Sequence, residues 1–371
     1  MRKLALSDEI LLKVDKAARY IGGEVNSVMK DKNAVDIRFA MCFPDVYEIG
    51  MSNLGMMILY NMFNQREDVW CERLFSPWPD LDKVMREKKI PLFALESQEP
   101  IRDFDFLGIT IGYEMCYTNI LQVLDLSGIP LKSADRGEDF PIVIGGGACA
   151  YNPEPLAPFF DLFYIGEGET VYDALFDAYK ANKKAGGSRR DFLLAAAKIP
   201  GIYVPSLYEV TYKEDGTIAS FAPTEAGVPE KVQKQLIIDM EKEYRAVEAP
   251  VVPHIKATQD RVTLEIQRGC IRGCRFCQAG MIYRPTRERD VETLKESARI
   301  MLKNTGHEEI SLSSLSSSDY SQLKELVNFL IEEFHGKAIN ISLPSLRIDA
   351  FALDVMSKVP VSYTHLRAHE T

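Results

Sequence analysis

The feature that most limits the fold of this chain is a set of short apolar segments that alternate with helical patterns. Residues 106–111 and 141–144 are apolar almost throughout, and residues 35–43 and 91–95 are further strand candidates. Continuous apolar strands are typical of a parallel sheet that helices cover on both faces. The pattern therefore predicts an α/β fold, with a Rossmann-like open parallel sheet in a domain over residues 34–180.

Other regions flank or follow this domain. Residues 1–33 have helical spacing and are expected to form a helical lead-in. Residues 181–260 are expected to be a linker that contains a hairpin around Asp215-Gly216. Strands and helices alternate again over residues 261–360, in too few units to close a (β/α) barrel. Residues 361–371 fit neither pattern, and we expect them to be a non-native tail.

Charge and hydropathy exclude some classes of partner. A net charge of -10 at pH 7 argues against broad nucleic-acid binding, which draws on surplus Lys and Arg. No apolar run reaches about 18 residues, so no membrane span is expected. The start of the chain becomes acidic too soon for a secretory signal. Four of the seven cysteines are scattered, as expected for reduced, buried thiols in a cytoplasmic protein.

The remaining cysteines, Cys270, Cys274 and Cys277, have the spacing C-x3-C-x2-C. Thiolates are soft ligands for zinc and for iron in sulfide clusters, and a compact loop can direct three of them at one centre. Three protein ligands leave one iron of a four-iron cluster open to a reactant. A zinc site is the alternative, but the nearest histidines, His254 and His307, lie well outside the loop.

Residues 267–277 follow a strand candidate and place an aromatic residue before the third cysteine, and this segment resembles the radical SAM signature. The resemblance implies that Cys270, Cys274 and Cys277 hold a 4Fe-4S cluster and that S-adenosylmethionine binds at its open iron. It implies reductive cleavage of S-adenosylmethionine, with an electron donor such as flavodoxin or ferredoxin as partner. Residues 261–360 would then be the first half of a radical SAM barrel.

Polar residues after the next two strands match the family less closely. Ser313 and Ser314 stand where the family often has Gly-Gly-Glu to hold the methionine amino group, and this sequence departs from that triplet. Ser345 and Arg347 stand where polar groups would meet the methionine carboxylate, which suits the two-pronged geometry of arginine. The alternatives are serines that only shape a loop and a pair between Arg347 and Asp349.

Other charged residues near the loop have plainer interpretations. Asp319 stands where an N-cap belongs, with Gln322 as its partner, ahead of an amphipathic helix. Arg287 and Arg289 are expected to lie in a solvated basic loop.

The layout of the chain resembles radical SAM proteins that carry a cobalamin-binding-type domain ahead of the barrel. In residues 44–50, Tyr47 replaces the histidine that supplies the lower cobalt ligand in some cobalamin proteins, so cobalamin would bind without a histidine ligand. Gly145 and Gly146 would let a flat or anionic ligand approach the backbone, unless they form only a tight turn. Cobalamin is thus a candidate cofactor, and with it methyl transfer is the leading outcome.

Other functions stay open on the sequence alone. One alternative is a non-catalytic zinc-binding module, and another is a ligand-sensing α/β module that binds a nucleotide through its glycine loops. A partial barrel would expose apolar strand edges, so we expect the chain by itself to be inactive even if its parent is an enzyme. Nothing in the sequence indicates the substrate.

Overall fold

A computed structural model describes residues 4–347 of the chain. The chain divides into two compact units, the first formed by Met1–Ile237 with Val251–Gln259 and the second by Ile238–Pro250 with Asp260–Thr371. The first unit therefore runs well past residue 180, where the sequence pattern placed its end. The expected non-native tail lies outside the described residues.

The first unit contains a six-stranded sheet with the order β2-β1-β3-β4-β5-β6. Its strands are β1 (Ile37–Phe43), β2 (Val69–Phe75), β3 (Phe106–Thr110), β4 (Ile142–Gly146), β5 (Leu162–Tyr164) and β6 (Ile202–Tyr203). All neighbours pair in parallel except β5 and β6, which are antiparallel. The order of the first five is that of the flavodoxin-like doubly wound sheet, so the expected open parallel sheet is confirmed.

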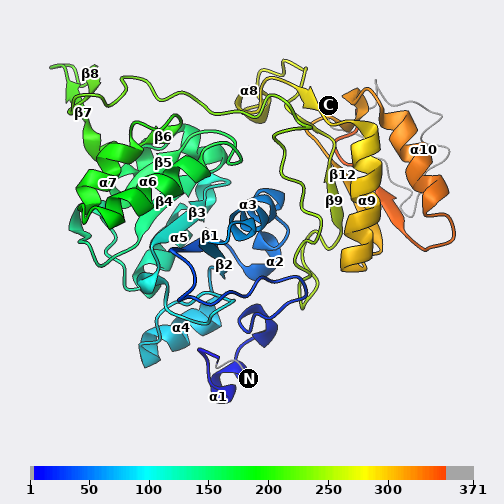
Figure 1. Ribbon diagram of the computed structural model, residues 1–371, viewed down its shortest axis with the longest axis horizontal. Helices are drawn as coiled ribbons and strands as arrows, with labels where there is room; N and C mark the ends of the chain where they lie inside the picture. The colour runs from blue at the N-terminus through cyan, green and yellow to red at the C-terminus, as the bar shows by residue number, and fades with distance from the viewer. Residues whose placement is uncertain (1–3, 348–371) are drawn as a thin grey trace. The chain divides into compact units, whose positions relative to one another are not determined.

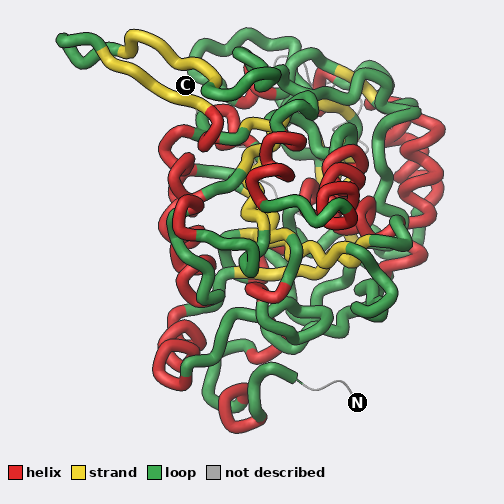
Figure 2. The backbone as a smooth tube through the Cα atoms, turned by 60° about the vertical axis from the view of Figure 1, so that its left-hand side comes forward, coloured by secondary structure: helices red, strands yellow, loops and turns green. Residues whose placement is uncertain are grey.

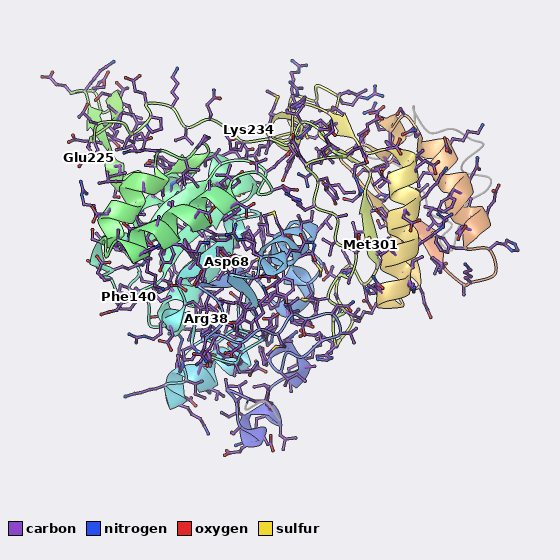
Figure 3. All side chains as sticks on the ribbon, in the orientation of Figure 1. Arg38, Asp68, Phe140, Glu225, Lys234 and Met301 are labelled. Carbon is purple, nitrogen blue, oxygen red and sulfur yellow. The ribbon has the colours of Figure 1, made fainter. Side chains whose placement is uncertain are left out.

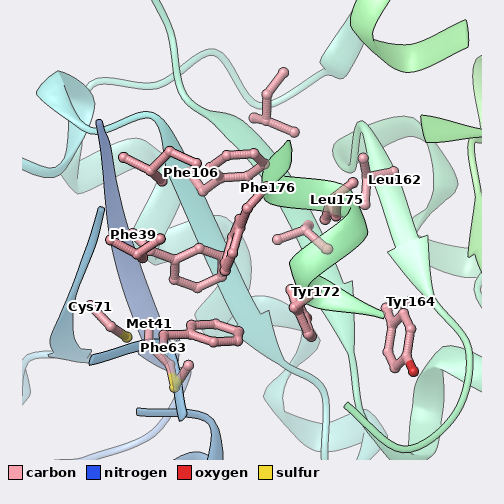
Figure 4. Packing of buried hydrophobic residues seen from close by; sticks show 14 of the residues in the cluster. Phe39, Met41, Phe63, Cys71, Phe106, Leu162, Tyr164, Tyr172, Leu175 and Phe176 are labelled. Carbon is pink, nitrogen blue, oxygen red and sulfur yellow. The ribbon is translucent and has the colours of Figure 1, made fainter. Parts of the chain in front are cut away.

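Helices cover both faces of this sheet, as Figure 1 shows. The helices are α2 (Tyr47–Gly50), α3 (Leu54–Gln65), α4 (Pro79–Lys88), α5 (Tyr117–Leu126), α6 (Tyr172–Lys184) and α7 (Arg189–Ala196). Phe39 and Met41 of β1 belong to the core formed with α3, α6 and α7, whereas Ala40 and Cys42 belong to the core formed with α4 and α5. Phe39 contacts Phe63 of α3 with ring centroids 4.9 Å apart (Figure 4). Burial of alternate side chains on both faces explains why the strands read as continuous apolar runs.

Strand β2 was missed by the apolar pattern because Glu72 and Arg73 lie within it. Both are buried, and buried charges persist when they are paired. Glu72 accepts from Arg38 of β1 at 2.7 Å, and Arg38 is labelled in Figure 3. Arg73 pairs with Glu96 at 2.6 Å and with Glu24 at 2.7 Å. These ion pairs let a charged sequence form a fully buried strand at the edge of the sheet.

The prediction of a strand at residues 91–95 is wrong. Apart from an isolated bridge between Phe93 and Pro100, the segment forms no strand. The Leu92 amide donates to the carbonyl of Leu126 at the end of α5, and the Leu95 amide donates to the carbonyl of Arg73. The segment is apolar because it packs against the sheet, with Leu92 and Leu95 both buried.

Residues 1–33 and 181–260, which flank the expected first domain, form only part of the predicted secondary structure. The lead-in contains a short helix, α1 (Asp8–Leu11), and a 3-10 turn at Ala17–Arg19 rather than a longer helical segment. Residues 181–260 contain the expected hairpin, formed by β7 (Tyr208–Tyr212) and β8 (Ile218–Pro223), which Figure 2 shows extending from its neighbours. They also contain α7 and β6, which complete the first unit and are not linker.

The second unit contains three parallel strands in the order β13-β12-β9. Its main elements are β9 (Val262–Glu265), α9 (Val291–Thr305), β12 (Glu309–Ser313), α10 (Leu323–Glu333) and β13 (Asn340–Ser342). Both helices share one core with the strands. Neighbouring strands follow each other in the sequence, as in a partial (β/α) barrel, and their carboxyl ends lie at one edge. No helix within residues 4–347 is long and apolar enough to cross a membrane.

Candidate metal centre

A short antiparallel pair closes the cysteine loop, residues 269–286, at its base. β10 (Gln267–Arg268) pairs with β11 (Arg287–Glu288), and the helix α8 (Ala279–Ile282) lies inside the loop. Gly269 begins the loop with a φ of +82°, and a Cβ there would lie 2.6 Å from the carbonyl oxygen of Pro285. Glycine is required at this turn, so the loop leaves the sheet at a fixed point.

The three predicted ligands lie in the first half of this loop, before α8. Cys270 and Cys277 are half-buried and Cys274 is exposed. The backbone amide of Arg272 donates to Sγ of Cys270 at 3.4 Å, and that of Gly280 donates to Sγ of Cys277 at 3.3 Å. Two of the sulfur atoms therefore already accept backbone hydrogen bonds, a kind of contact that tunes iron–sulfur clusters.

The structure does not gather the three sulfur atoms themselves. Within residues 4–347, no group of three Cys, His, Asp or Glu side chains is placed so that it could hold a metal ion. What fits a thiolate-bound cluster is the donor set: three soft ligands on one loop, with backbone amides directed at two of them. Metal binding would have to draw the side chains together, as is usual where ligand binding and local ordering are coupled.

The segment after β12 contacts the cysteine loop, and the segment after β13 contacts the segment after β12. Arg272, between the first two cysteines, donates through Nε to Oδ2 of Asp319 at 2.9 Å, after the end of β12. Ser317 is fully buried and donates to the carbonyl of Pro344, after β13, at 2.6 Å. Parallel strands bring their carboxyl ends together, and these contacts join the three segments that follow them.

The structure places Ser313 and Ser314 at this edge. Ser313 is the last residue of β12, and its carbonyl accepts from the amide of Ile266 at 3.0 Å. The hydroxyl of Ser314 shares a hydrogen bond of 2.9 Å with that of Ser317. Ser313 thus ends the strand and Ser314 shapes the loop that follows it, and Ser313 lies beside the strand end that leads to the cysteines.

Ser345 and Arg347 reach the same edge from β13. Ser345 is exposed and has a φ of +57°. The amide of Arg347 donates to the hydroxyl of Ser318 at 2.9 Å. The charge of Arg347 also helps to lower the pKa of Asp319. The alternative pair with Asp349 falls outside the described residues.

Asp319 does not cap a helix. The N-cap of α10 is Gln322, which makes no capping hydrogen bond through its side chain. The hydrogen bond from Arg272 instead lowers the pKa of Asp319 to about 2, against the smaller opposing effect of burial. The sequence pattern was consistent with a cap, because an acidic residue ahead of a helix looks the same in either role.

Arg287 and Arg289 are buried, with exposed fractions of 7% and 4%. The prediction that they lie in a solvated basic loop is therefore wrong. Arg287 donates to the carbonyl of Pro285 at 3.0 Å. The guanidinium of Arg289 lies 4.3 Å from the ring centroid of Tyr244, and that of Arg268 lies 5.3 Å from it. Tyr244 thus covers the base of the cysteine loop by cation–π contacts. No motif marks Tyr244, which lies in the expected linker.

In the first unit, the side chain of Tyr47 is buried in the interior. It is only 1% exposed and donates to Oε1 of Glu24 at 2.9 Å. Burial, together with the charge of Glu24, raises the pKa of the phenol. The residue that replaces the cobalamin histidine is therefore a structural hydrogen-bond donor.

Gly145 and Gly146 are residues of β4 rather than of a loop. A Cβ on Gly145 would lie 2.7 Å from the ring of Phe163, so packing explains this glycine. A Cβ on Gly146 would meet nothing closer than 4.0 Å. The strand order reverses between β1 and β3, where open sheets bind ligands. There, Tyr113 after β3 donates to Asp45 after β1 at 2.6 Å.

Comparisons with known proteins agree with this two-unit organisation. Residues 55–205 match the family described as radical SAM proteins, N-terminal, and residues 264–369 match the radical SAM superfamily. The chain is 27% identical over 318 residues to the uncharacterized protein MJ0966 of Methanocaldococcus jannaschii, an alignment that covers 85% of this chain and 57% of that protein.

A solved structure has a similar fold. It is that of TsrM from Kitasatospora setae, a radical S-adenosylmethionine methyltransferase with cobalamin and a [4Fe-4S] cluster bound. The TM-score is 0.51 at 13% identity, and the match covers 87% of this chain and 57% of that one. This chain thus spans little more than half the length of either protein. The two family matches follow one another along the chain, the second over the cysteine loop and its strands, and the chain is a radical SAM protein.

Proposed function

We propose that the chain forms the cluster-binding part of a radical SAM enzyme, in which Cys270, Cys274 and Cys277 ligate a 4Fe-4S cluster with S-adenosylmethionine at its open iron. The observation that carries this proposal is the C-x3-C-x2-C loop at the carboxyl end of β9, within the radical SAM match. Cluster and S-adenosylmethionine together supply the reductive cleavage of a carbon–sulfur bond.

The protein's own residues would hold and orient these groups. Ser313 and Ser314 lie on the segment that contacts the cysteine loop and its strand, and Arg347 lies on a segment that contacts theirs, which supports their assignment to the S-adenosylmethionine site. Ser345 is exposed on the same segment as Arg347 and would complete the polar set. Cys274 is exposed, which supports access for a protein electron donor such as flavodoxin or ferredoxin.

The finer part of the proposal is methyl transfer assisted by cobalamin. Two observations support it: the flavodoxin-like strand order of the first unit and the fold shared with TsrM. Cobalamin would bind without a ligand from Tyr47, because that phenol donates to Glu24. Replacement Tyr47→Phe should therefore leave the visible spectrum of added cobalamin unchanged, and a changed spectrum would show that the phenol contacts cobalt.

Anaerobic reconstitution tests the central proposal. The wild-type chain should take up roughly four irons and as many sulfides, with broad visible absorbance. Each of Cys270→Ala, Cys274→Ala and Cys277→Ala should lose this absorbance. The matched control is Cys149→Ala, which removes a buried thiol from the first unit and should keep the cluster.

Two other results would support the alternative functions. Stoichiometric zinc without sulfide would identify a zinc-binding module. Nucleotide binding that survives replacement of all three loop cysteines, in a chain that takes up no iron, would identify a ligand sensor.

A further inference from the structure

The cysteine loop is attached to the end of β12 by a charged pair that lies outside the ligand set. Arg272, between Cys270 and Cys274, binds both carboxylate oxygens of Asp319 through Nε and Nη2, with Nε 2.9 Å from Oδ2. Two-pronged binding fixes the direction of a guanidinium as well as its position. A pair at this place therefore restrains the middle of the ligand-bearing segment.

Asp319 is itself held firmly in place. The hydroxyl of Ser316 donates to its Oδ2 at 2.7 Å. The carbonyl of Ser316 in turn accepts from Nε2 of Gln267 at 2.8 Å, at the base of the loop. The side chain of Asp319 is 8% exposed and that of Arg272 is 36% exposed. The carboxylate is thus the fixed partner, and the arginine is the part that reaches to it.

The pair acts on a ligand through the backbone of Arg272. The amide of this residue donates to Sγ of Cys270 at 3.4 Å, so the restrained guanidinium and the sulfur contact belong to one residue. Hydrogen bonds to cluster sulfur stabilise the reduced form and raise the reduction potential. Loss of the pair would free the amide and remove that stabilisation.

We propose that Arg272 and Asp319 are positioning residues that hold the cysteine loop against the end of β12 and fix the amide contact to Cys270. The cluster role rests on the proposed function, whereas the restraint of the loop does not. Neither residue ligates iron. They set how readily the cluster is kept and reduced.

The test compares Asp319→Asn, Arg272→Ala and Arg272→Lys in the 371-residue chain. Iron loss to a chelator under anaerobic conditions should be about 10-fold faster in Asp319→Asn and Arg272→Ala, as for other residues that support metal ligands. Arg272→Lys keeps the charge but not the two-pronged contact, so its rate of iron loss should fall between those of wild type and Arg272→Ala. The midpoint potential from redox titration should become more negative in Arg272→Ala, which loses a cation and an ordered amide donor.

A second measurement uses the chain without a cluster. Amide hydrogen exchange over residues 269–286 should be faster in Asp319→Asn than in wild type, while exchange in α9 stays the same and shows that the unit is folded. The exchanged pair Arg272→Asp with Asp319→Arg should recover part of the protection. The matched control is Arg299→Ala, which breaks the exposed pair with Glu333 at 3.2 Å on α9 and α10 and should leave loop exchange and iron loss unchanged.

The outcomes are distinguishable. Equal loop exchange and equal iron loss in wild type and Asp319→Asn would overturn the positioning role. A wild-type chain that takes up no iron would overturn the proposed function and the cluster role with it, while the exchange data would still decide whether the pair restrains the loop.

Discussion

Among single residues, two of the three glycines of the cysteine loop have opposite constraints. Gly269 has a φ of +82° and no room for a Cβ, whereas Gly273 has nothing within 4 Å of its Cβ position. We expect Gly269→Ala to destabilise the loop by about 1–3 kcal/mol, because the backbone would be strained and would clash with Pro285. Iron retained after reconstitution should fall in Gly269→Ala and stay at the wild-type level in Gly273→Ala. Equal retention would show that the turn is dispensable.

Glu48 gives the first unit a defined dependence on pH. Arg19 and Lys16 donate to its carboxylate at 2.8 Å and 2.9 Å. Burial opposes ionisation, but these hydrogen bonds prevail and lower the pKa from 4.5 to about 2. The carboxylate therefore stabilises the folded state above pH 4.5, and this contribution is lost as the pH falls toward 2.

Glu48→Gln should accordingly be less stable than wild type at pH 7, and the difference should shrink between pH 4.5 and pH 2. Denaturant unfolding at a series of pH values measures it. The control is Glu87→Gln, the same replacement at an exposed position of α4. A difference that is independent of pH would mean that Glu48 acts through packing alone.

Single residues also show where sequence reasoning reached its limit. The spacing of Cys270, Cys274 and Cys277 is local, so a sequence motif can reveal it. The partner of Arg272 lies 47 positions away and looks like an ordinary helix cap. Arg289 is a charged residue in a loop, and its guanidinium contacts Tyr244, a residue that the sequence does not connect to it. Contacts between distant segments have no signature in one sequence.

At the scale of elements, β4 offers a matched pair of glycines. Gly145→Ala would place a Cβ 2.7 Å from Phe163 and 2.9 Å from Ile111, whereas Gly146→Ala would have no contact closer than 4.0 Å. We expect Gly145→Ala to lower the free energy of unfolding by about 1–3 kcal/mol, as overpacking does. Gly146→Ala should have a smaller effect, and thermal or denaturant unfolding measures both.

Titration with cobalamin separates packing from ligand contact in the same two variants. If Gly146 lets a ligand approach the backbone, Gly146→Ala should weaken cobalamin binding without lowering stability. Unchanged binding in that variant would show that Gly146 is not part of a cobalamin site.

Strands β1, β3 and β4 and helix α9 were predictable because their side chains obey one simple rule, burial on one or both faces. Strand β2 was not, because its stability depends on ion pairs made by Glu72 and Arg73 with three other segments. The apolar segment at residues 91–95 was wrongly predicted to be a strand, because burial alone does not distinguish a strand from a packed loop.

For the whole molecule, each unit has its own hydrophobic core. A ligand stabilises only the folded unit that binds it. We expect calorimetry to resolve two unfolding transitions. Reconstitution with iron and sulfide should raise the midpoint temperature of one of them. Hydrogen exchange should assign the transition with the raised midpoint temperature to the unit that contains α9. A single transition, or a shift of both, would show that the units unfold together.

The antiparallel pair of β10 and β11 at the base of the cysteine loop has a consequence for loss of the cluster. Oxygen destroys exposed clusters, and a site that depended on iron for its fold would collapse with them. Here β10 and β11 pair through their backbones, so the two ends of the cysteine loop stay together whether or not a cluster is bound. We therefore expect a chain that has lost its cluster to stay folded and to accept a new one.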